Sequence, residues 1–218
     1  MGIPHGSLVD RLEATYSGAI FDVLREMGLP DQALPSNLRP LDPKMKLAGP
    51  VFTASGSTAA ISEDESVLRW CDLLSQAPAG HVVVCQPNDS TVSHMGELSA
   101  ETLNFRGVRG YVVDGGCRDT SFILGLGFRV FCRYTTPGDI VGRWSVDTLG
   151  EPIRIGNLAI HSGDYIMGDM DGLVIIPKAL VEECVDRVVK VISTENLVRK
   201  AILSGVDPKE AYLKYGRF

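Results

Sequence analysis

The segment 112–120, Val-Val-Asp-Gly-Gly-Cys-Arg-Asp-Thr, carries the residues of this chain that are best suited to chemistry. An apolar run typical of a strand leads into Gly115 and Gly116, which have no side chain and let the backbone approach a ligand closely. Arg118 and Asp119 follow at once. An arginine can bind a carboxylate through two parallel hydrogen bonds, and an aspartate is a hard oxygen ligand for a divalent cation. The spacing therefore predicts a site that holds a carboxylate-bearing substrate together with a metal ion.

The order of the surrounding elements predicts a second anion-binding segment beside the first. Residues 81–85 have the apolar run of a buried strand, residues 96–105 the pattern of a helix, and residues 110–113 that of another strand. In a parallel strand–helix–strand unit, the helix N-terminus and the end of the second strand reach the same edge of the sheet. We therefore expect residues 96–99 to face Arg118 across one crevice, with the backbone amides around Leu98 and Ser99 as free donors.

Length and composition predict a single domain over residues 1–218, with a C-terminal helical segment from about 179 to 218. Hydrophobic residues make up 44% of the chain, which is enough for one large core. The net charge of -6 and the lack of a basic stripe argue against nucleic-acid binding. No apolar run has the length of a membrane span or of a signal peptide, so we expect a soluble, cytoplasmic protein without a membrane partner.

Helices and strands are predicted to alternate along the rest of the chain, which gives a mixed α/β class. Apolar residues at helical spacing predict one helix over 8–27 that ends at Gly28, and the prolines of 30–50 predict a loop or an extended crossover. Short runs separated by tight turns over 153–177 predict an antiparallel or mixed β layer. The remaining predictions are strands over 51–54 and 130–133, helices over 63–75 and 120–126, a helix from 179 towards 205, and a last helix capped by Asp207.

Other residues of chemical interest have simpler interpretations. The five cysteines are scattered, which suits buried thiols in a reducing compartment, and the four histidines lack the spacing of a zinc site. Cys117 has no evident histidine partner that would make it a nucleophile. Residues 169–172 start like a calcium loop but lack its later ligands, so we expect a hairpin turn. Residues 143–147, with an arginine and a tryptophan, are predicted to form a loop that either covers the pocket or packs between subunits.

Several segments of the chain resemble one known family, the regulator of ribonuclease E activity A family. It includes the class II 4-hydroxy-4-methyl-2-oxoglutarate (4-carboxy-4-hydroxy-2-oxoadipate) aldolases. The resemblance implies an α/β/β sandwich related to the swivelling phosphohistidine domain, assembled as a homotrimer or as a dimer of trimers. The matching segments are 94–99 (HMGELS), 110–119 (GYVVDGGCRD), 130–133 (VFCR), 163–177 (GDYIMGDMDGLVIIP) and, more loosely, 195–199 (ENLVR).

The resemblance also implies roles for individual residues. In the aldolases, Arg118 matches the arginine that binds substrate, and Asp119 matches the sole direct protein ligand of a magnesium or manganese ion. Glu97 stands where the family often has an acid that contacts water on the metal, and Glu195 is the candidate for an acid contributed by the neighbouring subunit. The segment that matches the binding site of the pyruvyl carboxylate comprises Gly96, Glu97, Leu98 and Ser99.

The expected function is that of a divalent-metal-dependent lyase. Such an enzyme cleaves a 4-hydroxy-2-oxo acid to release pyruvate and decarboxylates oxaloacetate, because a cation beside the 2-oxo oxygen stabilises the negative charge that develops there. Two alternatives remain open. The family's founding members bind and inhibit ribonuclease E, and a related lyase reaction, such as the dehydration of a sugar acid, would use the same site. Methyl transfer is disfavoured because the sequence shows no glycine-rich nucleotide loop.

Overall fold

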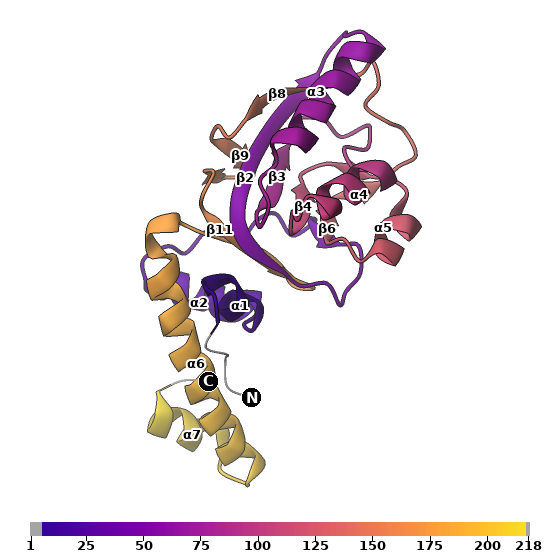
Figure 1. Cartoon of the computed structure of the whole chain (residues 1–218). Coiled ribbons are helices and arrows are strands. Elements are labelled where there is room, and N and C mark those ends of the chain that lie inside the picture. The colour runs from indigo at the N-terminus through magenta and orange to yellow at the C-terminus, as the bar shows by residue number, and fades with distance from the viewer. Residues whose placement is uncertain (1–5, 217–218) are drawn as a thin grey trace.

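A computed structural model, which describes residues 6–216, shows a mixed α/β fold built on one large curved sheet (Figure 1). The strands of this sheet follow the order β1-β6-β4-β3-β2-β11-β12, and β8 pairs with the second half of the long strand β2. The mixed α/β class is as predicted; the relation to the swivelling phosphohistidine domain stays a prediction. The strand bounds are β1 Arg39–Pro40, β2 Leu47–Thr58, β3 Val82–Gln86, β4 Gly110–Val113, β6 Val130–Cys132, β8 Trp144–Leu149, β11 Tyr165–Asp169 and β12 Gly172–Ile176.

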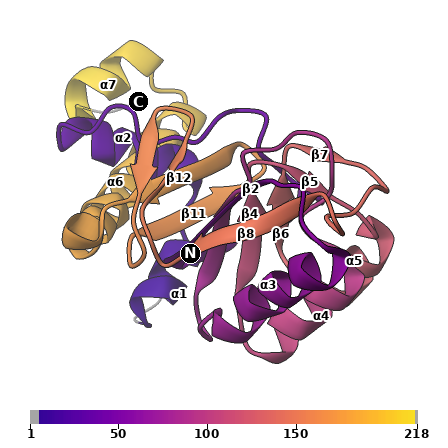
Figure 2. The ribbon, with the colours of Figure 1, turned by 90° about the horizontal axis from the view of Figure 1, so that it is seen from above.

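The parallel half of the sheet contains the strand–helix–strand unit that the sequence predicts. Strands β2, β3, β4 and β6 are parallel neighbours, with α3 (Glu63–Gln76), α4 (Glu97–Phe105) and α5 (Thr120–Leu126) in the connections between them. Seen from above, the three helices lie on one side of the sheet (Figure 2). The N-terminus of α4 and the C-terminal end of β4 therefore share one edge.

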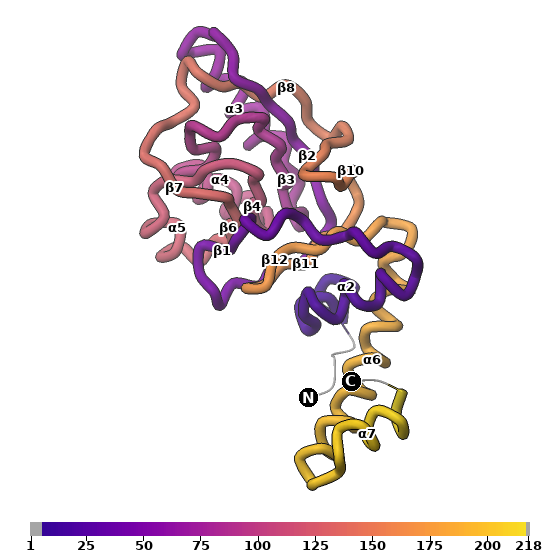
Figure 3. Tube along the Cα trace, turned by 180° about the vertical axis from the view of Figure 1, so that it is seen from behind, coloured from indigo at the N-terminus to yellow at the C-terminus, as the bar shows by residue number. Residues whose placement is uncertain are grey.

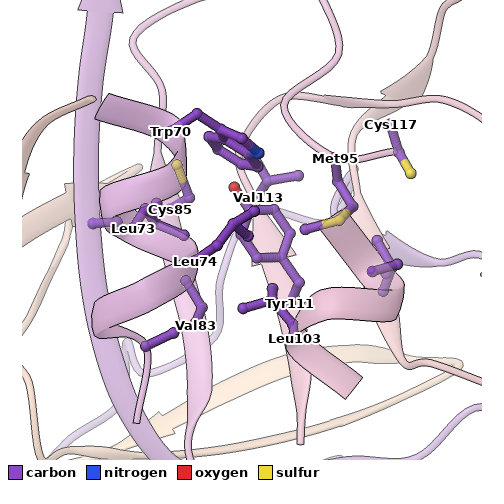
Figure 4. Packing of buried hydrophobic residues seen from close by; sticks show 14 of the residues in the cluster. Trp70, Leu73, Leu74, Val83, Cys85, Met95, Leu103, Tyr111, Val113 and Cys117 are labelled. Carbon is purple, nitrogen blue, oxygen red and sulfur yellow. The ribbon is translucent and has the colours of Figure 1, made fainter. Parts of the chain in front are cut away.

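Alternation along the buried strands divides the core between the two faces of the sheet. Val83 on β3 and Tyr111 on β4 point to the helix side, where they pack with Trp70 and Leu73 of α3 and Leu103 of α4 (Figure 4). The neighbouring residues on each strand belong to a different cluster on the other side. That cluster includes apolar residues of β9 (Ile153–Ile155), β10 (Leu158–Ile160), β11 and β12. Antiparallel pairing of β9 with β10 and of β11 with β12 confirms the β layer predicted over 153–177.

The remaining helices pack at the β11–β12 end of the sheet. Helices α1 (Leu8–Glu13), α2 (Ser17–Glu26) and α6 (Val181–Leu203) share a cluster of buried residues with β11 and β12. The second half of α6 and the short α7 (Pro208–Tyr215) extend away from the sheet (Figure 3). The Asp207 side chain accepts hydrogen bonds from the amides of Lys209 and Glu210, which confirms it as the N-cap of α7.

The single helix predicted over 8–27 is wrong, because two helices occupy these residues. The break lies between Glu13 and Ser17, and a distant carboxylate stabilises it. Asp169, which is buried in the β11–β12 hairpin, accepts hydrogen bonds from the backbone amide and the hydroxyl of Ser17 at 2.8 and 2.7 Å. The hairpin turn at 169–172 is confirmed, and its aspartate satisfies the N-terminus of α2.

Two further predictions underestimated the β structure. Strand β2 begins at Leu47, within the stretch predicted as a loop or an extended crossover, and its Pro50 pairs with Tyr165 of β11. The loop predicted over 143–147 is also wrong. Trp144 and its neighbours form the start of β8, and the Trp144 side chain is fully buried, so it neither covers a pocket nor lies on the surface.

Two further observations concern membrane-spanning helices and cysteines. Within residues 6–216, the structure has no helix with the length and apolar character needed to span a membrane. All five cysteines are free, and every one except Cys71 is buried, as expected for small core residues.

We expect Gly56→Ala to lower the free energy of unfolding by about 1–3 kcal/mol, because overpacking a well-packed core has this cost. A Cβ atom at Gly56 on β2 would collide with the Trp144 ring and the Ser145 carbonyl on β8. Gly125, inside α5, faces open space, so Gly125→Ala is the control and should be neutral or stabilising by up to about 1 kcal/mol. Urea unfolding followed by circular dichroism measures both. Equal stability of the two variants would contradict the tight β2–β8 packing.

Candidate active site

The edge formed by α4 and the end of β4 carries a cavity of about 420 Å³. Its lining brings together the two segments that the sequence predicts to face each other, Gly96–Ser99 and the Arg118–Asp119 pair. All six predicted residues of these segments thus share one cavity, although their roles stay predictions. The residues contributed by other segments are Val67 and Trp70 of α3, Ser93, His94 and Met95 before α4, and Asp139, Ile140 and Val141 of a later loop.

Asp119 follows β5 (Gly116–Cys117) and lies where this segment meets the N-terminus of α4. Its Oδ2 atom accepts a hydrogen bond from the Glu97 amide at 3.1 Å and lies 3.5 Å from Arg118 Nε. A Cβ atom at Gly96 would lie 2.8 Å from the same oxygen, so glycine lets the carboxylate take this position without a shift of its side chain. Asp119 itself has a left-handed backbone (φ 54°) and precedes α5, which spans Thr120–Leu126 as predicted.

Arg118 is held between two carboxylates at the mouth of the cavity. Its Nη1 atom donates to Asp139 Oδ2 at 3.3 Å, while Nε faces Asp119. The Arg118 side chain remains 37% exposed, and its backbone amide donates to the Met95 carbonyl at 2.9 Å. This backbone bond ties the Arg118 segment to the turn before α4. The guanidinium is therefore positioned by Asp119 and Asp139 and is still accessible to an anion.

The first turn of α4 presents unused backbone donors to the cavity. Among the described residues, the amides of Leu98 and Ser99 make no hydrogen bond, whereas the Glu97 amide is bound to Asp119. The Ser99 hydroxyl accepts a hydrogen bond from Trp70 Nε1 at 2.9 Å, so it is oriented by the wall of α3. Free N–H groups at a helix N-terminus attract anions, because the helix dipole adds to their partial positive charge.

The paired glycines before Arg118 are required by packing within the chain. A Cβ atom at Gly115 would lie 2.6 Å from His94 Nδ1, and one at Gly116 would lie 2.6 Å from the Val92 carbonyl oxygen. From the sequence, these glycines are expected to let the backbone approach a ligand closely. In the structure they let β5 (Gly116–Cys117) lie against the turn that precedes α4.

The residues around Asp119 fit a magnesium or manganese ion that keeps most of its water. Asp119 Oδ1 makes no hydrogen bond among the described residues, and the carboxylates of Glu97 and Asp139 line the same cavity. No group of three histidine, cysteine or acidic side chains in residues 6–216 is arranged to enclose a metal ion. A single carboxylate with nearby oxygen groups suits a hard cation, since magnesium is bound by few protein ligands and loses water reluctantly.

His94 is a buried neutral side chain in the floor of the site. Its ring packs edge-on against Trp144, with the ring centres 5.0 Å apart, and Nδ1 accepts a hydrogen bond from the Gly116 amide at 3.3 Å. Nε2 lies 3.4 Å from the Asp89 carboxylate without the alignment of a hydrogen bond. Burial lowers the pKa of His94 to about 4, although the Asp89 charge opposes this shift. The imidazole is therefore uncharged at neutral pH.

Cys117 does not have the environment of a nucleophile. A hydrogen bond with the Cys132 thiol, together with burial, raises the pKa of Cys117 above its usual value. The thiol thus stays protonated at neutral pH, which agrees with the structural interpretation of this cysteine.

Glu195 does not lie in this cavity within the same chain. It sits on α6, where its carboxylate accepts a hydrogen bond from the Tyr16 hydroxyl at 2.6 Å, and it lines a separate cavity with Val198, Arg199, Ile202 and Leu203. This bond and burial raise the pKa of Tyr16 to about 12, with burial the larger cause. A role for Glu195 at the active site therefore requires a neighbouring subunit.

Sequence reasoning missed the residues that line the far side of the cavity. Trp70 and Asp139 come from segments 48 and 21 residues away from Arg118, and neither carries a recognisable motif. The one available signal was the helical spacing of Val67 and Trp70, which lie one turn apart on α3. The sequence predicts a loop over 143–147 that covers the pocket or packs between subunits. In the structure, Ile140 and Val141, just before that segment, line the cavity instead.

Comparison with known proteins decides the family. Residues 17–175, which span the sheet and the cavity, match the family model described as RraA-like, Aldolase/RraA. The chain belongs to the RraA-like family. This family includes both aldolase-named proteins and proteins described as ribonuclease inhibitors.

Individual proteins are similar to this chain over most of its length. A Halalkalibacterium halodurans protein, provisionally named 4-hydroxy-4-methyl-2-oxoglutarate aldolase, is 29% identical over 83% of each chain. A Streptomyces coelicolor protein described as an unusual member of the RNase ES inhibitor RraA family is 27% identical, with a TM-score of 0.80 over 90% of this chain and 98% of that one. An uncharacterised Pseudomonas syringae protein shares the fold, with a TM-score of 0.87 at 24% identity over 99% and 96%.

The buried His94 of this RraA-like chain predicts a loss of stability in weak acid. The unfolded chain gains a proton on this side chain near pH 6.5, whereas the folded chain gains it only near pH 4. The free energy of unfolding should therefore fall as the pH decreases from about 6.5 to about 4, by up to about 3 kcal/mol. Urea unfolding at several pH values measures this slope.

Two variants separate this effect from the other titrating groups. His94→Asn should remove the His94 part of the slope, because it has no titrating group. His161→Asn should retain it, because the His161 side chain is 61% exposed. The same slope in both variants would show that His94 is not its source.

Proposed function

We propose that this RraA-like chain is a divalent-metal-dependent lyase that cleaves a 4-hydroxy-2-oxo acid and releases pyruvate, and that it also decarboxylates oxaloacetate. The observation that carries the proposal is the convergence of one aspartate, one arginine and a free helix N-terminus in a single cavity. The aldolase names of similar proteins support the same chemistry. We further propose that the chain acts as a homotrimer or a dimer of trimers.

The residues of the cavity provide for the carboxylate and the 2-oxo group of such a substrate. The free amides of Leu98 and Ser99 can donate to the carboxylate, and the Arg118 guanidinium can reach it from the opposite wall. Asp119 would hold a magnesium or manganese ion, which supplies a Lewis acid for the charge that develops on the 2-oxo oxygen. Because Arg118 is fixed by Asp139 and Asp119, it needs little rearrangement to reinforce that stabilisation.

Proton transfer is assigned to the acids at the mouth of the cavity. Retro-aldol cleavage removes the proton of the C4 hydroxyl, so a base must lie within reach of it, directly or through one water molecule. Glu97 is the candidate within the chain, because it lines the cavity at the first residue of α4. Glu195 of a neighbouring subunit is the second candidate. Decarboxylation of oxaloacetate does not require this base.

A regulatory role is the second candidate function. The similar Streptomyces coelicolor protein is described as a member of a ribonuclease inhibitor family, and a fold alone does not determine which function a member has. Metal-dependent pyruvate release that EDTA abolishes and magnesium restores would favour the lyase. Binding to ribonuclease E without turnover on a panel of oxo acids would favour the regulator.

Arg118→Ala and Asp119→Ala should each reduce metal-dependent pyruvate release by about a hundredfold or more, because each removes charge stabilisation in the transition state. The assay couples pyruvate from oxaloacetate to lactate dehydrogenase, with spontaneous decarboxylation subtracted. Arg154→Ala is the matched control, since Arg154 is an exposed arginine on β9 outside the cavity. Both test variants should keep the circular dichroism spectrum of the parent protein. Near-normal turnover in either variant would reject this site.

The proposed role of Glu195 is tested by comparison with its partner within the chain. Glu195→Gln should lower turnover on a 4-hydroxy-2-oxo acid by about tenfold to a hundredfold, as loss of acid–base assistance does. Tyr16→Phe removes the Tyr16–Glu195 hydrogen bond but retains the carboxylate, so it should leave turnover near normal. Co-expression of the Glu195→Gln and Arg118→Ala chains should restore part of the activity if the two residues meet between subunits. Equal losses in Glu195→Gln and Tyr16→Phe would assign Glu195 a purely structural role.

A further inference from the structure

We infer that Arg143 determines specificity for the far end of the substrate, because it forms a subsite with Thr136 and Gly138 that binds a second carboxylate on C4. This inference rests on the proposed lyase function and concerns the part of the substrate that leaves with C4. The carboxylate of C1 keeps its place at the amides of α4 and Arg118. Oxaloacetate, which also has two carboxylates, is compatible with such a subsite.

Arg143 differs from the other arginines of the chain because its guanidinium has no partner. Every other arginine within residues 6–216 has a hydrogen bond or an ion pair from its guanidinium to an oxygen atom. Arg143 is exposed, and its backbone is fixed just before β8. Its amide donates to the Ile140 carbonyl at 3.0 Å, and its carbonyl accepts from the Ala59 amide at 3.1 Å. A cation on such a fixed base is available to an external anion.

The Arg143 guanidinium lies beside an open space at Gly138. A Cβ atom at Gly138 would lie 4.0 Å from Arg143 Nη1 and 4.0 Å from Thr136 Oγ1, with no closer contact outside its two chain neighbours. The Thr136 hydroxyl makes no hydrogen bond among the described residues. Two unused donors therefore flank the same space, which suits a carboxylate because it accepts several hydrogen bonds.

This space adjoins the proposed binding site through both neighbours of Gly138. Asp139, the next residue, lines the cavity of about 420 Å³ and accepts a hydrogen bond from Arg118. Pro137, the residue before, lines a second cavity of about 300 Å³ that Arg118 and Asp119 also border. A substrate whose carboxylate and 2-oxo group are held at Arg118 and Asp119 can therefore extend its far end towards Gly138.

The opposite side of the cavity offers a carboxylate no such donors among the described residues of the chain. Val67, Trp70 and Ile140 form an apolar wall there, and Trp70 Nε1 already donates its hydrogen to the Ser99 hydroxyl. A carboxylate that loses its water against an apolar surface is strongly disfavoured, whereas a guanidinium and a hydroxyl replace that water. The second carboxylate is therefore expected on the Gly138 side.

Backbone hydrogen bonds hold the subsite in a fixed position relative to Arg118. The Gly138 carbonyl accepts from the amide of Ser93, which lines the larger cavity, at 2.8 Å. The Thr136 amide donates to the carbonyl of Cys117, the residue before Arg118, at 3.1 Å. Donors that are fixed in advance need little reorganisation to bind an anion.

The test compares two substrates that differ only at the far end. In 4-hydroxy-2-oxoglutarate C4 bears a carboxylate, and cleavage gives pyruvate and glyoxylate. In 4-hydroxy-2-oxopentanoate C4 bears a methyl group, and cleavage gives pyruvate and acetaldehyde. With magnesium present, we expect kcat/KM of the parent protein to be at least about tenfold higher for the dicarboxylate. Pyruvate is measured by proton NMR, because lactate dehydrogenase also reduces glyoxylate.

Arg143→Ala should remove this preference. The value of kcat/KM for the dicarboxylate should fall by about tenfold or more, because a charged hydrogen bond is lost, while the value for the methyl compound stays within about threefold of the parent. Arg143→Lys retains the charge and should recover part of the loss. Arg154→Ala is again the control, and it should leave the ratio of the two values unchanged. All three variants should keep the circular dichroism spectrum of the parent protein.

Gly138→Ala tests the space and leaves the cation in place. Its methyl group would stand at ordinary contact distance from Arg143 and Thr136, and Gly138 does not have a left-handed backbone, so the variant should fold. Because the methyl group occupies the space of the carboxylate, kcat/KM for the dicarboxylate should fall by at least about threefold, with the methyl compound unaffected. Gly125→Ala, whose added Cβ atom faces open space, is the matched control and should leave both values unchanged.

Two results would assign these residues differently and overturn the inference. If Arg143 pairs with an acid of a neighbouring subunit, Arg143→Ala should lower kcat/KM equally for both compounds and shift the oligomer distribution in size-exclusion chromatography. If Arg199 of a neighbouring subunit binds the second carboxylate, Arg199→Ala should remove the preference and Arg143→Ala should retain it. Arg199 follows Glu195 by one turn of α6, so it would accompany Glu195 into a neighbouring cavity.

One further measurement separates failure of this inference from failure of the proposed function. A lyase of this kind should exchange the methyl protons of pyruvate with deuterium from the solvent in a metal-dependent way, whichever far end it prefers. Exchange without a preference for the dicarboxylate would overturn the inference and leave the proposed function intact. Absence of exchange, with no cleavage of either compound, would overturn the proposed function and the inference with it.

Discussion

The placement of the Asp119 carboxylate against the first turn of α4 is the interaction on which the site depends. One oxygen accepts the Glu97 amide and lies near Arg118 Nε, while the other remains available for a cation. Gly96 permits this approach because any Cβ atom there would contact the carboxylate. The same contact joins the segment after β4 to the start of α4, so it sets the geometry of the proposed metal site and of the proposed carboxylate site together.

The floor and the far wall of the cavity are continuous with the core of the protein. His94 packs on Trp144, Trp144 packs on Trp70, and Trp70 contacts Tyr111 of the central strand β4. Close packing of these aromatic rings fixes the wall opposite Arg118, because a well-packed interior has few alternative arrangements. The position of the apolar wall is therefore a property of the α3–sheet interface, and the charged wall opposite is built from loops.

Membership of the RraA-like family does not by itself determine what the cavity of this chain does. The proteins similar to this chain include some named as aldolases and one described as a member of a ribonuclease inhibitor family, so the sheet and its helices do not distinguish the two functions. The arrangement of charge in the cavity is the more informative feature. One arginine, three acids and a free helix N-terminus suit a small anionic substrate held beside a cation, which is the arrangement that the proposed lyase function requires.

Local patterns in the sequence determined the β3–α4–β4 unit, the helix over 120–126 and the meeting of Gly96–Ser99 with Arg118 and Asp119. Strand and helix periodicity depend on neighbouring residues, and the handedness of parallel crossovers leaves one arrangement for such a unit. The tertiary structure alone decided the features that depend on distant segments. Asp169 divides the first helix through a contact 152 residues away in the chain, and β8 forms because Gly56 of β2 leaves room for Trp144. The wall of Trp70 and the position of Asp139 beside Arg118 arise in the same way, since burial and pairing are set by segments that only folding brings together.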